Sequence, residues 1–340
     1  MKKILLIHTG GTFGMMPTEP EQVLAPADIR ELILRHLPEV EQLAHIDFEV
    51  VFNIDSANIQ PHHWQKLARL IRDRYRDYHG FVIIHGTDAM VYTAAALSFM
   101  LRGLDKPVIL TGSQRPLAKI RSDARSNLIN SVELATFPIP EVAIFFSTRL
   151  FRGNRTIKIS STHYDAFTSP NYPPLAEVGL DISLSGNYLP PGEELIYREQ
   201  FDTRVVSFRF FPGLSPDYLE HILHTSIRAV VIEAMGLGNV AIQENSLIPW
   251  VENMTAAGKM VVIGSQNPYG YVDLNLYECG KLIQQAGAIS ARDMTVETAI
   301  VKLMFLLGEY GNDMQAVQRD FSRSLAGEIT ERPEQTGAEE

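Results

Sequence analysis

Short, wholly apolar segments alternate with segments of helical periodicity along the first half of this 340-residue chain. Most of the short segments are continuously apolar, which is typical of strands buried on both faces of a parallel sheet. Between them, apolar residues recur every three or four positions, as in helices that pack one face on such a sheet. The alternation predicts an α/β fold, a mostly parallel sheet with helices on both faces. The predicted strands are Ile4–Ile7, Phe48–Phe52, Phe81–Ile84, Val108–Leu110 and Val142–Phe146, and the predicted helices lie near residues 29–37, 61–78, 93–101 and 127–135.

The chain is longer than one core usually serves, because a single hydrophobic core stops growing at about 250–300 residues. The strand–helix pattern breaks after Phe146, where residues 149–175 have no helical period and indicate a hairpin and loops. A second, smaller α/β series follows, with strands at Val205–Phe211, Ala229–Ile232 and Met260–Ile263, and helices at Tyr218–His224, Leu276–Gln285, Val296–Leu307 and Met314–Phe321. We therefore expect four parts: an N-terminal domain 1–185, a turn-rich linker 186–204, a smaller α/β domain 205–330 and a flexible tail 331–340.

The composition is that of a folded globular protein, with 45% hydrophobic and 21% charged residues. A formal net charge of -10 gives no overall attraction to nucleic acid or to anionic membranes, so we expect neither as a partner. The first apolar run stops at His8, short of the roughly 7–15 residues of a signal sequence, and no run reaches the ~18 residues of a membrane span. We expect a cytoplasmic protein. The single cysteine, Cys279, forms no intrachain disulfide, and no Cys/His cluster has the spacing of a zinc site.

Hydroxyl and carboxylate side chains follow several predicted strands at the point where each strand ends. The segments are Thr9-Gly10-Gly11-Thr12, Asp55-Ser56-Ala57, Thr87-Asp88 and Thr111-Gly112-Ser113-Gln114. Because ligands of open parallel sheets bind beyond the carboxyl ends of the strands, we expect these segments to form one site.

Each of these residues also has a purely structural interpretation. Thr12, which follows two glycines, suits a nucleophile at a strand end, but it also suits a helix cap or a turn. Asp88 suits binding of an ammonium group, or the N-cap of the next helix. Asp55 and Ser56 suit the binding of a ligand, or the formation of an Asx turn. Alone, Lys158 has the features of a solvated loop lysine.

Two further interpretations concern histidines and nucleotides. His8 and His85 stand at strand ends, where we expect packed or hydrogen-bonded rings rather than catalytic ones. A nucleotide-phosphate loop is disfavoured because the first glycine turn lacks both the G-x-G-x-x-G pattern and the G-K-[ST] ending.

Taken together, the segments resemble the two signatures of the bacterial-type L-asparaginases. The first signature is Thr9-Gly10-Gly11-Thr12 and the second is His85-Gly86-Thr87-Asp88-Ala89-Met90. The likeness continues through residues 111–114, 153–158, 169–175 and 293–297, so it spans nearly the whole chain. Without an export signal, the chain is most similar to the cytoplasmic, type I branch.

The resemblance implies an amidohydrolase that converts L-asparagine to L-aspartate and ammonia. It implies that Thr12 is the nucleophile, which forms a β-aspartyl ester, and that Thr87, Asp88 and Lys158 form a second catalytic group. It further implies that Asp55, Ser56 and Ala57 line the substrate pocket together with Thr87 and Asp88, where Asp88 also contacts the substrate ammonium.

The resemblance also has implications for the fold and the oligomeric state. It implies a doubly wound N-terminal domain, a smaller C-terminal α/β domain and a homodimer or homotetramer. The implied chemistry requires no metal and no organic cofactor.

The chain departs from the family pattern at three places. Ala89 replaces the threonine common in the second signature, and we expect a small effect. Many relatives carry a tyrosine in the loop after the first signature, whereas residues 15–26 contain none and place Leu24 near that position. Some cytoplasmic relatives bind asparagine at an allosteric site through a threonine and an arginine. Here Ile157 and Glu233 occupy those positions, so we expect no such site.

Two other functions remain open at this point. Glutamyl-tRNA amidotransferase subunits use the same amidase domain to deliver ammonia to a partner. They generally carry an extra N-terminal domain, which we do not expect here because the first signature starts at Thr9. A non-catalytic protein that binds amino acids or nucleotides is the other alternative, because the strand–helix order is shared by many functions.

Overall fold

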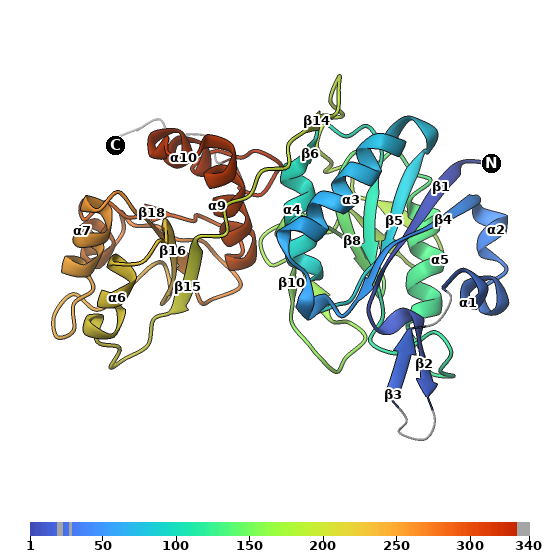
Figure 1. Ribbon diagram of the computed structural model, residues 1–340, viewed down its shortest axis with the longest axis horizontal. Helices are drawn as coiled ribbons and strands as arrows, with labels where there is room; N and C mark the ends of the chain where they lie inside the picture. Colours follow the sequence, from blue (N-terminus) through green and yellow to red (C-terminus); the bar gives the residue numbers. More distant parts are fainter. Residues whose placement is uncertain (19–22, 27–28, 332–340) are drawn as a thin grey trace, which may run out of the picture. The chain divides into compact units, whose positions relative to one another are not determined.

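The computed structural model describes residues 1–18, 23–26 and 29–331, and the chain divides into two compact units, Met1–Phe201 and Asp202–Glu340. Each unit contains a sheet with helices packed on it, mainly parallel in the first unit and wholly parallel in the second (Figure 1). The division between Phe201 and Asp202 falls inside the segment 186–204 that the sequence predicts as a linker. The predicted tail lies outside the described residues from position 332 onward.

The first unit is built on an eight-stranded sheet with the order β13-β12-β9-β8-β7-β5-β1-β4. Its five parallel strands coincide with the five strands predicted from the sequence, and this confirms the α/β fold. They are β1 (Lys3–Gly10), β4 (His45–Ile54), β5 (Gly80–Ile84), β7 (Val108–Thr111) and β8 (Val142–Phe146). The antiparallel strands β9 (Arg149–Arg152), β12 (Ala176–Val178) and β13 (Ile182–Leu184) extend the β8 edge.

The connection order creates a switch point near the β4 edge of this sheet. After β1, the chain places β4 on one side of β1 and then returns to place β5 on the other side. At such a point the loops leave the carboxyl ends of neighbouring strands in opposite directions, which opens a crevice for a ligand. The loops after β1 and β5 carry the two glycine-containing segments that the sequence singles out.

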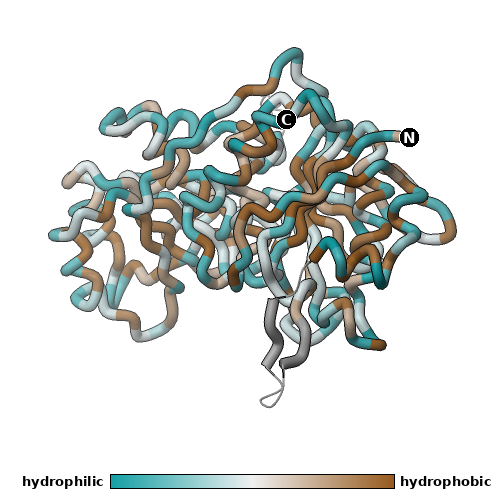
Figure 2. Tube along the Cα trace, turned by 45° about the vertical axis from the view of Figure 1, so that its right-hand side comes forward, coloured by the Kyte–Doolittle hydropathy of each residue, from teal (hydrophilic) through white to brown (hydrophobic). Residues whose placement is uncertain are grey.

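Helices cover both faces of the sheet (Figure 1). α3 (Pro61–Arg74) and α4 (Met90–Met100) lie on one face. On the other, α1 (Ile29–His36), α2 (Val40–Leu43) and α5 (Ala124–Leu134) pack on alternate strand residues such as Leu6 and Val82 in one apolar cluster. Figure 2 shows the apolar residues concentrated in the strands at the centre of the unit, as a core buried on both faces requires.

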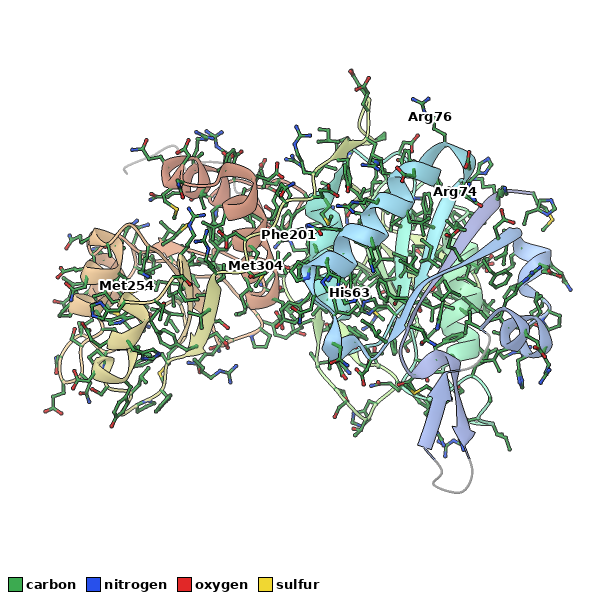
Figure 3. The ribbon with its side chains drawn as sticks, viewed as in Figure 1. His63, Arg74, Arg76, Phe201, Met254 and Met304 are labelled. Carbon is green, nitrogen blue, oxygen red and sulfur yellow. The ribbon has the colours of Figure 1, made fainter. Side chains whose placement is uncertain are left out.

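Helix α3 illustrates how the local sequence sets an element's start. Pro61 occupies the first turn, where a missing N–H costs nothing, and the backbone N–H of Gln60 donates to Nδ1 of His63 at 3.0 Å. His63 is labelled in Figure 3. The apolar stripe extends farther than the α-helix, because Tyr75 begins a 3-10 turn (Tyr75–Asp77) and Tyr78 lies beyond it.

The second unit contains a four-stranded parallel sheet, β15 (Val205–Arg209), β16 (Ala229–Ala234), β17 (Met260–Ser265) and β18 (Ile289–Ser290). Its helices are α6 (Glu220–Leu223), α7 (Ile248–Ala256), α8 (Glu278–Gln285), α9 (Val296–Tyr310) and α10 (Met314–Phe321). The sequence-based prediction missed α7, whose side chains Trp250 and Met254 are buried in the core of this unit. Met254 is labelled in Figure 3. It also predicted one helix at Tyr218–His224, where a 3-10 turn (Pro216–Leu219) precedes the short α6.

Two short hairpins and one strand pair complete the described strands. They are β2 (Met15–Thr18) with β3 (Val23–Pro26), β10 (Ile157–Lys158) with β11 (Phe167–Thr168), and β6 (Leu101–Arg102) with β14 (Ile196–Tyr197). In the part of the chain that the structure describes, no helix combines the length and the apolar character that crossing a membrane requires.

Candidate active site

Three loops meet in close contact at the carboxyl edge of the first sheet. Gly11 adopts φ 85°, and a Cβ built on it would lie only 2.5 Å from the Cα of Gly86. A Cβ on Gly86 would in turn lie 2.6 Å from Oγ of Ser56. Only glycine permits both the positive φ at Gly11 and such close approach at the two positions. The contacts bring together the loops after β1, β5 and β4, as the strand-end argument predicts.

Lys158 joins this edge from the β10–β11 hairpin. Its Nζ donates to Oγ1 of Thr87 at 2.8 Å and to Oδ1 of Asp88 at 2.6 Å. Pairing of Ile157 with Thr168 and of Lys158 with Phe167 fixes the hairpin's register. The Lys158 side chain is only 16% exposed, whereas the Asp88 side chain is 68% exposed. Asp88 thus holds the lysine with one oxygen and remains open to a ligand, and Lys158 is not the solvated loop lysine of the structural interpretation.

Thr12 begins a 3-10 turn (Thr12–Gly14) directly after β1 and is half-buried. The N-cap of this turn is Gly11, so the Thr12 hydroxyl does not cap it. The structure records no hydrogen bond of that hydroxyl with the described residues. Thr87, Asp88 and Lys158 are in direct contact, while Thr12 is linked to them through the packing of Gly11 against Gly86.

The loop after β4 supplies the remaining predicted residues. Oδ1 of Asp55 accepts a hydrogen bond from the Ala57 N–H at 2.9 Å, so Asp55 does form an Asx turn. Asp55 and Ala57 are exposed, whereas Ser56 is buried beneath them and its Oγ lies 3.4 Å from the Ala89 N–H. Ala89 is the N-cap residue of α4, so Asp88 is free of that structural role.

Two residues of this edge were not assigned a role from the sequence. Oγ1 of Thr87 lies 3.4 Å from Oε1 of Gln114, and Nε2 of Gln114 donates to the carbonyls of Ser160 and His163 at 3.3 and 3.1 Å. Asp123 in turn accepts from the Gln114 N–H at 2.9 Å, and desolvation raises the pKa of its carboxyl. Asp123 precedes a helix and has the sequence signal of an N-cap, while Gln114 carries no charge. Gln114 lies in a strand-end segment that was expected in the site, but no role was assigned to it, and Asp123 does not stand out before the chain is folded.

Both strand-end histidines are buried, which confirms the prediction of packed rings. Burial lowers the pKa of His8 to about 4 and that of His85 to about 4, because an imidazolium is poorly solvated in the interior. Both rings are neutral near pH 7. Among the described residues, no group of three or more His, Cys, Asp or Glu side chains is placed to hold a metal ion.

Comparison with known proteins gives matches over both units. The family model "Asparaginase, N-terminal" matches residues 3–189, and "Glutaminase/Asparaginase C-terminal domain" matches residues 204–321. The chain is 39% identical to L-asparaginase 1 of Escherichia coli K12, covering 97% of this chain and 98% of that protein. It is 35% identical to one of the polypeptides of the glutamyl-tRNA(Gln) amidotransferase of Sulfolobus acidocaldarius, covering 96% of this chain and 75% of that polypeptide. The solved thermostable L-asparaginase from Thermococcus kodakarensis superimposes with a TM-score of 0.90 at 34% identity, covering 97% of this chain and 100% of that one.

Proposed function

The chain belongs to the asparaginase family, and we propose that it hydrolyses L-asparagine to L-aspartate and ammonia through a covalent ester on Thr12. The contact of Lys158 with both Thr87 and Asp88, at the switch point of the sheet, is the observation that carries the proposal. Relatives similar over almost their full length are L-asparaginases, which supports the substrate.

The reaction divides one difficult step into two easier ones. In the first, Oγ1 of Thr12 bonds to the carbon of the substrate's side-chain amide and gives up its proton. The carbon–nitrogen bond then breaks, and the nitrogen takes a proton and leaves as ammonia. In the second, water attacks the carbonyl carbon of the resulting ester, and the bond to Thr12 breaks. Aspartate is released, and the Thr12 hydroxyl takes back a proton.

Both steps need a proton carrier and a stabilised oxyanion. Thr87, Lys158 and Asp88 form a continuous hydrogen-bonded network that we assign to proton transfer, a contribution typically worth ~10²–10⁴ in rate. The backbone N–H groups of the glycine turn before Thr12 and of Thr87 are the assigned donors to the oxyanion. Removal of one such donor in other enzymes costs about 2.7–4 kcal/mol.

A substrate that carries an ammonium, a carboxylate and an amide accounts for the other groups. The exposed carboxylates of Asp88 and Asp55 attract the ammonium. Ser56 and the exposed backbone near Ala57 bind the carboxylate. These assignments use groups with unoccupied hydrogen-bonding capacity, since Asp55 commits only Oδ1 to the Ala57 N–H.

Replacement of the nucleophile tests the proposal. We expect Thr12→Val, which keeps the shape but not the hydroxyl, to reduce ammonia release from asparagine by at least ~10³-fold, whereas Thr12→Ser retains measurable turnover. Asparagine should still raise the melting temperature of the Val variant in a thermal-shift assay. A Thr12→Val enzyme with wild-type turnover would refute the assignment.

The amidotransferase relatives favour one second candidate, a polypeptide that supplies ammonia for tRNA-dependent amidation. Ammonia release by the purified chain alone, without partner or tRNA, separates the two functions. A chain that is inactive alone and active only with a partner would favour the second. We also propose a cytoplasmic homodimer or homotetramer, which analytical ultracentrifugation of the purified chain tests.

A further inference from the structure

A chain of three buried polar groups ends on the loop that carries Thr87. Nε1 of Trp64, on α3, donates to Oγ1 of Thr93 at 3.1 Å. Oγ1 of Thr93, on α4, lies 3.0 Å from Nε2 of His85, and Nδ1 of His85 lies 2.7 Å from the carbonyl oxygen of Gly86. The chain therefore runs from two helices to the peptide group directly before Thr87.

The direction of every hydrogen bond in this chain follows from the chemistry of its ends. An indole N–H only donates and a peptide carbonyl only accepts. Nδ1 of His85 must therefore carry the proton that it shares with Gly86. In the neutral ring Nε2 is then an acceptor, so the Thr93 hydroxyl donates to it and accepts from Trp64. The ring is 1% exposed, and burial holds its pKa at about 4, so this neutral tautomer is the form present near pH 7.

The acceptor at the end of the chain controls a donor in the site. The Gly86 carbonyl and the Thr87 N–H belong to one planar peptide group and point in opposite directions. A hydrogen bond that holds the carbonyl therefore also fixes the direction of the N–H. The structure records no acceptor for the Thr87 N–H among the described residues, so this donor is available to a substrate.

We propose that His85 is a positioning residue that, through the Gly86 carbonyl, aims the Thr87 N–H at the oxygen of the substrate amide. The role rests on the proposed amidohydrolase function. His85 does not exchange a proton with the substrate, because its ring is enclosed and both nitrogens are occupied. Gly86 has no side chain to restrict its backbone conformation. The hydrogen bond from His85 therefore supplies a restraint that the residue itself lacks.

Two amide substitutions of His85 separate positioning from packing. In His85→Asn the side-chain NH₂ can take the place of Nδ1–H and still donate to the Gly86 carbonyl. In His85→Gln the amide reaches the place of Nε2, near Thr93, and the donor to Gly86 is lost. Both variants remove the ring, so both are expected to lower the melting temperature to a similar extent.

The expected result is a split in turnover without a matching split in stability. We expect kcat for asparagine to fall by ~30-fold or more in His85→Gln and by less than ~5-fold in His85→Asn, while KM changes less than ~3-fold in both, because the oxyanion donor acts mainly in the transition state. Equal kcat in the two variants, or losses that follow stability alone, would overturn the proposal.

The far end of the chain provides a second test if a His85 variant fails to fold. Thr93→Val removes the hydroxyl that holds the tautomer, and Thr93→Ser retains it. We expect kcat to fall ~5-fold or more in the Val variant and less than ~2-fold in the Ser variant. Equal kcat in both would contradict the proposal. A wild-type chain that binds asparagine but releases no ammonia would instead refute the amidohydrolase function itself.

Discussion

The two units of this protein each contain a lysine–carboxylate pair with the same 2.6 Å separation, Lys158–Asp88 in the first and Lys302–Glu328 in the second. The pair in the second unit is wholly buried. Nζ of Lys302 also donates to the carbonyls of Phe321 and Arg323, and Glu328 accepts from the N–H groups of Leu325 and Ala326. Both ions are thus surrounded by fixed partners within the described residues.

The pair in the first unit is arranged differently. Lys158 shares its donors between Asp88 and the Thr87 hydroxyl, and Asp88 is 68% exposed. The comparison teaches that pairing distance does not reveal a role. The buried pair Lys302–Glu328, which we call closed, joins α9 to the chain that follows α10 and stabilises the fold. The partly exposed pair Lys158–Asp88, which we call open, can still bind a ligand and move a proton.

Loss of Lys158 should have the largest effect, and it should fall on activity. We expect Lys158→Met to lower kcat by up to ~10⁴-fold, equivalent to ~5 kcal/mol in the barrier, because the proton-transfer network loses its central member. The free energy of unfolding should change by less than about 1 kcal/mol, since Asp88 remains solvated. Steady-state ammonia release and urea unfolding measure the two quantities. A stable and fully active variant would break the contrast.

Loss of Lys302 should lower stability strongly and activity little. We expect Lys302→Met to reduce the free energy of unfolding by about 3–5 kcal/mol, because Glu328 becomes a buried charge without its counter-ion. At a temperature where the variant is folded, kcat should stay within ~2-fold of the wild type. The double variant Lys302→Met/Glu328→Gln serves as the control and should recover part of the stability. No recovery would mean that the lost lysine packing, rather than the charge, dominates.

The buried hydrogen-bonded chain that contains His85 should make the stability of the first unit depend on pH. The pKa of His85 is about 4 in the folded chain, below the ~6.5 of an unfolded histidine. The unfolded chain therefore binds a proton that the folded chain rejects, and stability is full above pH ~6.5 and declines as the pH falls towards 4. The decline attributable to His85 is roughly 3 kcal/mol. Urea unfolding at pH 7 and 4.5 should show a smaller decline in His85→Asn than in the wild type. An equal decline in the variant and the wild type would contradict the attribution of the decline to His85.

The smallest expected effect concerns substrate binding in the open region. Ser56 is buried under Asp55 and Ala57, and its Oγ is placed near Gly86 and the Ala89 N–H. We expect Ser56→Ala to raise KM for asparagine by ~5-fold, close to the ~1 kcal/mol of one hydrogen bond, with kcat within ~2-fold. A fall in kcat with unchanged KM would assign Ser56 to the catalytic step instead.

Much of the first unit was predictable because its signals are local. A strand buried on both faces must be apolar along its length, and a helix on that sheet must be apolar every third or fourth residue, so the five parallel strands and α1, α3, α4 and α5 are visible in the sequence. Helix α7 was missed, although Trp250 and Met254 share its buried face. Its length does not explain this, because α1, α8 and α10 have eight residues each and were predicted, whereas α7 has nine.

The composition of the site was partly predictable for the same reason. Residues that follow parallel strands share one edge, so Thr12, Asp55 and Thr87 could be grouped before any coordinates were known. Gln114 belongs to a segment that was grouped in the same way, but its contact with Thr87 was not foreseen. Asp123 could not be grouped, because it stands at the start of a helix rather than at a strand end, and only the fold brings it to the Gln114 N–H.

By itself, then, the sequence determined the class of fold, the strand ends at which chemistry can occur and the resemblance to one enzyme family. Those properties depend on residue type and short spacing. Only the tertiary structure decided that Lys158 reaches Thr87 across 71 positions, that Lys302 is closed off by Glu328, and that His85 holds its proton on Nδ1. Each of these depends on which atoms meet and how much water remains between them, and folding alone brings such distant atoms together.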